Sequence, residues 1–195
     1  QILIEKGIDF TEADGEAAFY GPKIDIQAKN VYGKEDTMIT TQLDCAIADK
    51  FDMYYVDQNG DKVRPYIIHR TSMGCYERTL ALILEKYAGA LPLWMSPTQV
   101  KVITITDRVN EYAAKVNETL KAAGIRSELD ARAESANYKI RGAQLEKIPY
   151  MLVIGDKEVE EGTVSVRTRD GKNLGALSVE EFTAKAVMEN ATKAR

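Results

Sequence analysis

The chain has 195 residues, of which 45% are hydrophobic and 29% charged, a composition ordinary for a globular protein. Its formal net charge of −4 gives no global electrostatic attraction to nucleic acid. Its length accommodates one large domain or two small ones. Residues 1–96 carry 10 Lys and Arg against 15 Asp and Glu, whereas residues 97–195 carry 16 against 15, so a contact with a polyanion fits the second half better.

The two cysteines, Cys45 and Cys75, are too few for a disulfide framework and lack zinc-finger spacing, so we expect a reduced, cytoplasmic protein. No apolar run approaches the roughly 18 residues of a membrane span, and no signal-peptide pattern is present. The chain opens with Gln1-Ile2-Leu3 and no initiator Met, which fits a segment of a longer protein.

In the first half, runs with strand periodicity are joined by short turns such as Gly21-Pro22 and Asn59-Gly60, which favours an antiparallel sheet. The expected elements are a helix end over 1–7, strands over 24–28 and 36–44, a hairpin of 52–56 with 63–69, and a helix over 75–87.

Two prolines in the segment Leu91–Pro97 mark the expected domain boundary, which gives domains 1–96 and 97–195. Beyond it, strands alternate with helices, which predicts a small α/β domain with a largely parallel or mixed sheet. The expected strands cover 100–105, 125–129, 150–154 and 163–168, and the expected helices cover 107–123, 135–147 and the segment after a Ser178 cap.

The segment from Ile67 to Arg78 carries the strongest chemical signal. An apolar strand ends in His69-Arg70, a Ser/Gly break follows, and a helix then begins with Glu77-Arg78. A helix N-terminus favours anions, and an Arg can bind a phosphate through two parallel hydrogen bonds. The segment is therefore typical of one part of a nucleotide-using active site.

Several motifs in the same order resemble threonyl-tRNA synthetase. They are Ala18-Phe19-Tyr20-Gly21-Pro22-Lys23-Ile24-Asp25, Thr40-Thr41-Gln42-Leu43-Asp44, Ile68-His69-Arg70, Glu77-Arg78 and Pro149–Glu158. The resemblance covers nearly the whole chain and only the carboxy-terminal part of that family. It implies an antiparallel class II catalytic-sheet fragment with motif 3 over 1–96, and an α/β anticodon-binding domain with a mixed sheet over 97–195.

The resemblance also implies an activity for the intact enzyme, namely ATP-dependent ligation of threonine to threonine tRNA through threonyl adenylate. ATP with Mg²⁺ would be a substrate, Zn²⁺ a cofactor, and the intact enzyme a homodimer that does not associate with membranes. The chain alone is expected to be inactive. Two alternatives stay open, a non-catalytic nucleic-acid-binding relative of class II synthetases and a fragment of a prolyl-tRNA synthetase.

By resemblance, Arg78 contacts the ATP γ-phosphate, Cys75 lies in the same ATP-binding segment, and Lys23 lies near the reacting end of the tRNA. A permanently charged guanidinium suits phosphate, and a Lys suits developing negative charge. The competing interpretations are a surface Arg paired with nearby acids and a solvated lysine in a turn.

By resemblance, His69 is one of three protein ligands of a catalytic zinc, and the other two lie upstream of Gln1. Three ligands leave an open position that the amine and hydroxyl of threonine can fill. Tyr20 and Gln42 are expected in the threonine pocket. The alternatives are a core histidine with satisfied hydrogen bonds and ordinary sheet residues.

In the second domain, Arg141, Glu158 and Arg167 match positions that read anticodon bases in the family. Arg can stack on or hydrogen-bond a base, and Glu accepts from exocyclic amines. Ala133 stands where the family usually has Asn, so weaker anticodon discrimination is expected. Ordinary charges at a sheet edge are the alternative for Glu158 and Arg167.

Overall fold

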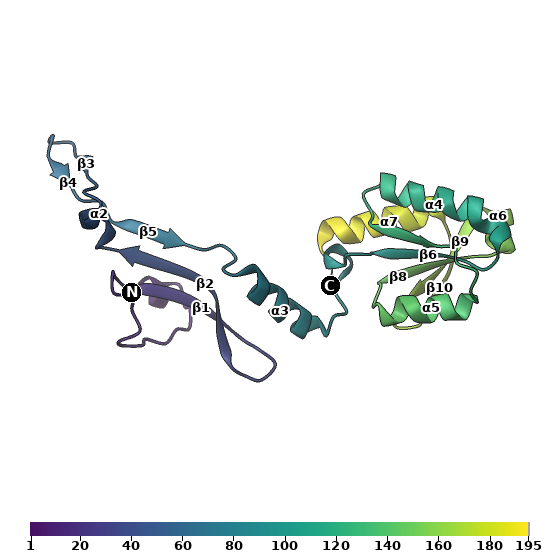
Figure 1. The fold of residues 1–195 in the computed structure, drawn as a ribbon, viewed down its shortest axis with the longest axis horizontal. Helices are drawn as coiled ribbons and strands as arrows, with labels where there is room; N and C mark the ends of the chain where they lie inside the picture. Colours follow the sequence, from purple (N-terminus) through teal and green to yellow (C-terminus); the bar gives the residue numbers. More distant parts are fainter. Residues whose placement is uncertain (195) are drawn as a thin grey trace. The chain divides into compact units, whose positions relative to one another are not determined.

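The computed structural model describes residues 1–194, and the chain divides into two compact units between Glu85 and Lys86 (Figure 1). Within the described range, no helix has the length and apolar character that a membrane crossing requires. The first unit contains α1 (Ile2–Glu5), β1 (Lys23–Lys29), β2 (Glu35–Asp44), α2 (Ile47–Lys50), β3 (Tyr55–Val56), β4 (Lys62–Val63), β5 (Ile67–Arg70) and most of α3 (Tyr76–Tyr87).

The first unit is built on an antiparallel sheet with strand order β1-β2-β5, and β3 and β4 form a separate two-stranded hairpin. The expected single strand over 63–69 is wrong, because it is divided into β4 and β5. Pro65 lies between them, and proline cannot donate a hydrogen bond to a strand ladder. The turn at Asn59-Gly60 is confirmed, with Gly60 at φ 86°.

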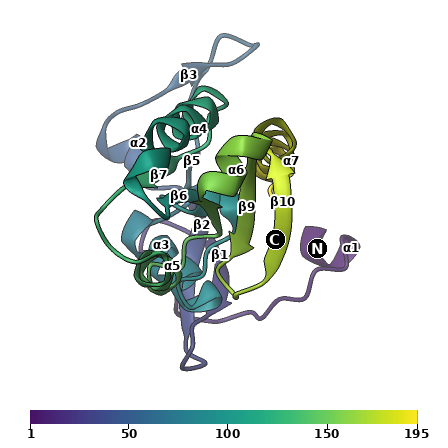
Figure 2. The same cartoon turned by 90° about the vertical axis from the view of Figure 1, so that its right-hand side faces the viewer.

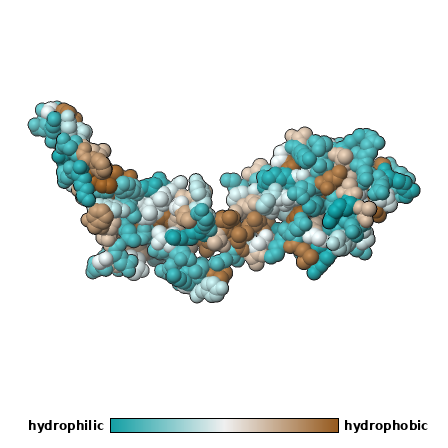
Figure 3. All heavy atoms as spheres, in the orientation of Figure 1, coloured by the Kyte–Doolittle hydropathy of each residue, from teal (hydrophilic) through white to brown (hydrophobic). Residues whose placement is uncertain are grey.

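Among residues 1–85, Ala48 is the one buried apolar residue. One face of the sheet carries Ile24, Ile26 and Ile68, which are 56%, 56% and 69% exposed. Figure 3 shows apolar side chains at the surface of the molecule in brown. A three-stranded sheet with an uncovered apolar face gains little from the hydrophobic effect, so this unit lacks a core of its own.

The second unit contains η1 (Leu93–Met95), β6 (Val100–Thr104), η2 (Asp107–Val109), α4 (Asn110–Ala122), β7 (Ser127–Asp130), α5 (Ala136–Leu145), β8 (Tyr150–Ile154), α6 (Asp156–Glu161), β9 (Thr163–Thr168), β10 (Asn173–Ser178) and α7 (Val179–Thr192). Its sheet has the order β10-β9-β8-β6-β7, with β6 parallel to β7 and β8 and the other pairs antiparallel. The expected mixed sheet is confirmed. Neither β10 nor α6 was anticipated from the sequence.

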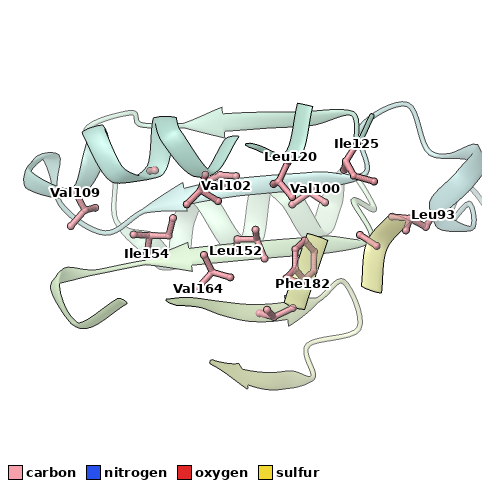
Figure 4. Packing of buried hydrophobic residues seen from close by; sticks show 14 residues of the cluster. Leu93, Val100, Val102, Val109, Leu120, Ile125, Leu152, Ile154, Val164 and Phe182 are labelled. Atoms are coloured by element: carbon pink, nitrogen blue, oxygen red, sulfur yellow. The ribbon is translucent and has the colours of Figure 1, made fainter. Parts of the chain in front are cut away.

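Helices cover both faces of this sheet, with α4 and α7 on one face and α5 on the other (Figures 1 and 2). Alternation along β6 sends Val100 and Val102 to the cluster shared with α4 and α7, and Ile103 to the smaller cluster under α5 (Figure 4). Phe182 of α7 is fully buried and meets the Tyr150 ring edge-on, with ring centroids 5.5 Å apart. Each such side chain contributes about 1.5–3 kcal/mol by leaving water.

The proline segment is held against the second unit by a guanidinium. Arg126 donates to the backbone carbonyl oxygens of Trp94 (3.0 Å), Ser96 (2.8 Å) and Pro97 (3.2 Å), and Leu93 is buried in the core. The compact units consequently divide between residues 85 and 86, inside α3, whereas the prolines suggested a division between 96 and 97.

The second unit can be tested by removing a core ring. We expect Phe182→Ala to lower its free energy of unfolding by about 3–5 kcal/mol, because the substitution leaves a cavity. Urea unfolding followed by the fluorescence of Trp94, the chain's one tryptophan, measures this unit. Leu80→Ala, at a 54% exposed position of the other unit, is the control and should leave the transition in place. An equal effect of both variants would contradict the assignment of the core.

Candidate active site and anticodon-binding unit

Strand register places three of the expected site residues in one row across the first sheet. Lys23 of β1 pairs with Gln42 of β2, and Gln42 pairs with His69 of β5. Residues directly opposite each other in adjacent strands project from the same face. Asp25 and Asp44 lie two residues along their strands, so they share this face, which is opposite to the face of the exposed isoleucines.

Tyr20 joins the row because the Gly21 turn extends the pairing of β1 with β2. Cys45 donates its backbone N–H to the Tyr20 carbonyl oxygen at 2.9 Å. At Gly21 a Cβ would lie 2.0 Å from the Leu43 carbonyl oxygen, so only glycine allows this approach. The Tyr20 hydroxyl donates to Gln42 Oε1, and its ring meets the His69 imidazole edge-on at 5.9 Å between centroids.

His69 is backed by a buried carboxylate. Its Nε2 lies 3.0 Å from Oδ2 of Asp44, which has no exposed surface, whereas the His69 side chain is 43% exposed. Asp44 Oδ1 accepts the backbone N–H groups of Ala46 (2.9 Å) and Ile47 (2.8 Å). Burial by itself raises the pKa of Asp44, but the hydrogen bonds from His69 and from these two amides outweigh it and hold the pKa below its usual value.

A second carboxylate holds the lysine of the row. Lys23 Nζ donates to Asp25 Oδ2 at 2.7 Å. This hydrogen bond, with the charge attraction between the two groups, raises the pKa of Lys23, and the same bond lowers the pKa of Asp25. Lys23 is therefore an ammonium ion at neutral pH and presents a fixed positive charge beside Gln42.

Arg78 and Cys75 lie near the other end of β2. Arg78 Nη1 donates to the carbonyl oxygen of Thr37 at 2.9 Å. Thr37 precedes Gln42 by five residues, which is roughly 15–17 Å along a strand. At Gly74 a Cβ would lie 2.2 Å from the Met38 carbonyl oxygen, at the point where the β1–β2 register shifts, so this glycine allows the start of α3 to approach the irregular part of β2.

Cys75 is exposed, and its thiol donates to Glu77 Oε2 at 2.9 Å, which lowers the pKa of Glu77. The structure thus forms two groups: Tyr20, Lys23, Gln42 and His69 in one, and Cys75 with Arg78 in the other. That both groups face a shared substrate stays a prediction.

The expected anticodon residues lie on three elements of the second unit. Arg141 is exposed on α5, and Arg167 is half-buried on β9 in the register row of Met151, whose side chain packs under α5. The two arginines therefore share the α5 side of the sheet. Glu158 lies on α6, where its Oε2 accepts the backbone N–H of Gly155 at 2.9 Å. This bond caps α6, and the structure does not bring Glu158 into contact with either arginine.

Sequence reasoning assigned no role to Asp25 or Asp44, which contact Lys23 and His69 in the structure. Asp44 ends the strand that holds Gln42, and period-two alternation places both on one face. That alternation was the available signal. Among residues 1–194, no group of three His, Cys, Asp or Glu side chains is arranged to hold a metal ion.

Comparison with known proteins assigns each unit to a family. Residues 2–87 match the tRNA synthetase class II core domain (G, H, P, S and T), and residues 99–189 match the anticodon binding domain. The crystal structure of the RNA binding domain of threonyl-tRNA synthetase from Cryptosporidium parvum Iowa II superposes with a TM-score of 0.85 at 37% identity, covering 95% of this chain and 47% of that one.

Curated relatives are similar over the whole chain. The threonine--tRNA ligases of Clostridium botulinum (strain Eklund 17B / Type B) and Clostridium perfringens (strain SM101 / Type A) are 56% identical over 100% and 99% of this chain. Threonine--tRNA ligase 1 of Bacillus subtilis (strain 168) is 48% identical over 97%. The chain spans 30% of the length of each of these three relatives. This chain is therefore a homologue of the threonine--tRNA ligases, made of a class II tRNA synthetase core segment followed by an anticodon-binding domain.

Proposed function

We propose that the protein containing this segment is an ATP-dependent threonine–tRNA ligase. It condenses threonine with ATP to threonyl adenylate and pyrophosphate, then transfers the threonyl group to the terminal ribose of threonine tRNA and releases AMP. The observation that carries the proposal is the row of Lys23, Gln42 and His69, joined by Tyr20, in a chain 56% identical to relatives of that name.

Lys23 contributes a positive charge and does not act as a general base. Its bond to Asp25 keeps the ammonium protonated, so it cannot remove a proton at neutral pH. A fixed cation stabilises negative charge that develops on the adenylate phosphate or at the end of the tRNA.

Arg78 binds the triphosphate of ATP, which enters with Mg²⁺. One of its nitrogens is anchored on the Thr37 carbonyl oxygen, and the remaining N–H groups of the guanidinium fork are available to phosphate oxygens. The residue lies in the first turn of α3, where the helix dipole also favours an anion. Cys75, just ahead of the helix, borders the same site.

Gln42 and Tyr20 line the threonine pocket. Because Gln42 Oε1 accepts the Tyr20 hydroxyl hydrogen, the amide NH₂ of Gln42 is left to donate to a substrate oxygen. A site built to hydrogen-bond a hydroxyl discriminates strongly against an analogue that lacks it.

His69 fits a zinc site as one ligand of a larger set. Its ring has one nitrogen next to the Asp44 carboxylate, an arrangement common behind metal-bound histidines. Among residues 1–194 no group of three such ligands is found, and the proposal places the other two ligands outside this segment. When bound, zinc would hold the amine and hydroxyl of threonine and thereby exclude valine.

The second unit reads the tRNA. Arg141 and Arg167 on the α5 side of the sheet offer two cations to the phosphates and bases of the anticodon loop, and Glu158 offers an acceptor. The homodimer and the cytoplasmic location expected for the intact enzyme remain predictions.

The first test separates the segment from the intact enzyme. We expect no threonine-dependent ATP–pyrophosphate exchange by residues 1–195, because two of the three proposed zinc ligands are expected outside this segment and its first unit lacks a core. The intact enzyme should exchange readily under the same conditions. Robust exchange by the segment would refute the division of the active site.

The second test addresses Arg78 in the intact enzyme. Arg78→Lys keeps the charge and removes the fork, so kcat/KM for ATP in the exchange reaction should fall about 10²–10³-fold. Arg64→Lys is the matched control, because the Arg64 guanidinium, just after β4, is paired with Asp49 of α2 and with Asp52. Equal kinetics of the two variants would remove the phosphate role of Arg78.

The third test concerns tRNA binding by the whole chain. Arg141→Ala with Arg167→Ala should weaken binding of threonine tRNA and flatten its dependence on salt, by about one unit of slope for each phosphate that is no longer neutralised. Lys115→Ala with Lys121→Ala removes the same charge from exposed positions of α4, on the other face of the sheet. Equally weakened binding in both double variants would indicate a nonspecific charge effect and would disprove the assignment.

A further inference from the structure

The carboxylate of Asp44 has one fixed orientation. Its Oδ1 accepts two backbone N–H groups, from Ala46 at 2.9 Å and Ile47 at 2.8 Å, and the side chain has no exposed surface. Rotation of the carboxylate would leave two partly buried backbone N–H groups without partners, which costs free energy. Oδ2 is therefore held in place, 3.0 Å from Nε2 of His69.

This orientation determines where the proton of His69 lies. An ionised carboxylate can only accept hydrogen bonds, so Nε2 must be the donor. A neutral imidazole carries a single N–H, which leaves Nδ1 with a free lone pair. In the part of the chain that the structure describes, Nδ1 makes no hydrogen bond, and the imidazole remains 43% exposed. The edge-on contact with the Tyr20 ring further limits rotation of the imidazole.

We propose that Asp44 is a positioning residue that fixes His69 as the Nε2–H tautomer and so presents Nδ1, and not Nε2, to the zinc ion. The zinc part of this inference rests on the proposed function, whereas the tautomer depends on the geometry of Asp44 and His69 alone. Asp44 itself touches neither metal nor substrate, and it acts through the imidazole.

Replacing Asp44 by Asn tests the inference, because this substitution should reverse the tautomer of His69. The backbone N–H groups of Ala46 and Ile47 require an oxygen at the position of Oδ1, so the Asn carbonyl must take it and its NH₂ must face His69. Nε2 then has to accept, and the proton moves to Nδ1. Asp44→Asn is thus expected to reverse the tautomer with almost no change in shape.

The tautomer can be read in the metal-free intact enzyme, where comparison with His69→Gln identifies the signals of His69. Long-range ¹H–¹⁵N NMR of this enzyme, labelled with ¹⁵N at histidine and recorded at alkaline pH, should show a protonated Nε2 and an unprotonated Nδ1. Asp44→Asn should exchange the two assignments. Asp57→Asn is the matched control, since Asp57 Oδ1 also accepts two backbone N–H groups, at 2.8 and 2.9 Å, but in the separate hairpin turn.

An unchanged tautomer in Asp44→Asn, or ¹⁵N shifts equal to those of free histidine in every variant, would overturn the inference. Zinc affinity of the intact enzyme gives a second readout, and Asp44→Asn should lower it about 10–100-fold. Reversal of the tautomer without a decrease in affinity would refute the zinc-facing role of Nδ1. Failure of the intact enzyme to activate threonine would instead refute the proposed function and leave the NMR result intact.

Discussion

Pairing of β2 with both of its neighbours is the constraint on which the candidate active site depends. It aligns Lys23, Gln42 and His69 in one row, although they are separated by many residues in the sequence. Close backbone contacts at Gly21 and Gly74 then attach Tyr20 to one end of β2 and the start of α3 to the other. A slip of one residue in either pairing would turn the row to the opposite face.

The chemistry of the row comes from carboxylates that touch no substrate in the proposed reaction. Asp25 keeps Lys23 charged, and Asp44 orients His69. Asp25 follows Lys23 by two residues on β1, whereas Asp44 reaches His69 from the neighbouring strand, so strand alternation and strand pairing together place the two acids. The pattern of a functional side chain next to its own supporting acid explains why a sheet with so little buried apolar surface still holds polar groups in defined geometry.

Most strands and turns of the first unit could be predicted from the sequence, because turn residues and period-two patterning mark the strands around Gly21 and Asn59-Gly60. The hydrogen-bond partner of His69 could not, since register depends on where the chain pairs and not on local composition. Pro65 was overlooked as a strand break, and β10 was missed because Gly175, at φ 88°, interrupts its alternation. In the second unit, the apolar runs over 100–105 and 150–154 predicted β6 and β8. The capping role of Glu158 is seen only in the structure, from its contact with the backbone N–H of Gly155.

The grip of Arg126 on three backbone carbonyl groups has a practical consequence for dissecting this molecule. A truncation between residues 96 and 97 would remove the Trp94 and Ser96 carbonyl groups that accept hydrogen bonds from the guanidinium, and would remove Leu93 from the hydrophobic core. Residues 93–97, whose prolines suggest a linker, therefore belong to the folded structure of the anticodon-binding domain. The compact unit begins at Lys86, so truncation variants of the anticodon-binding domain should retain residues 86–97.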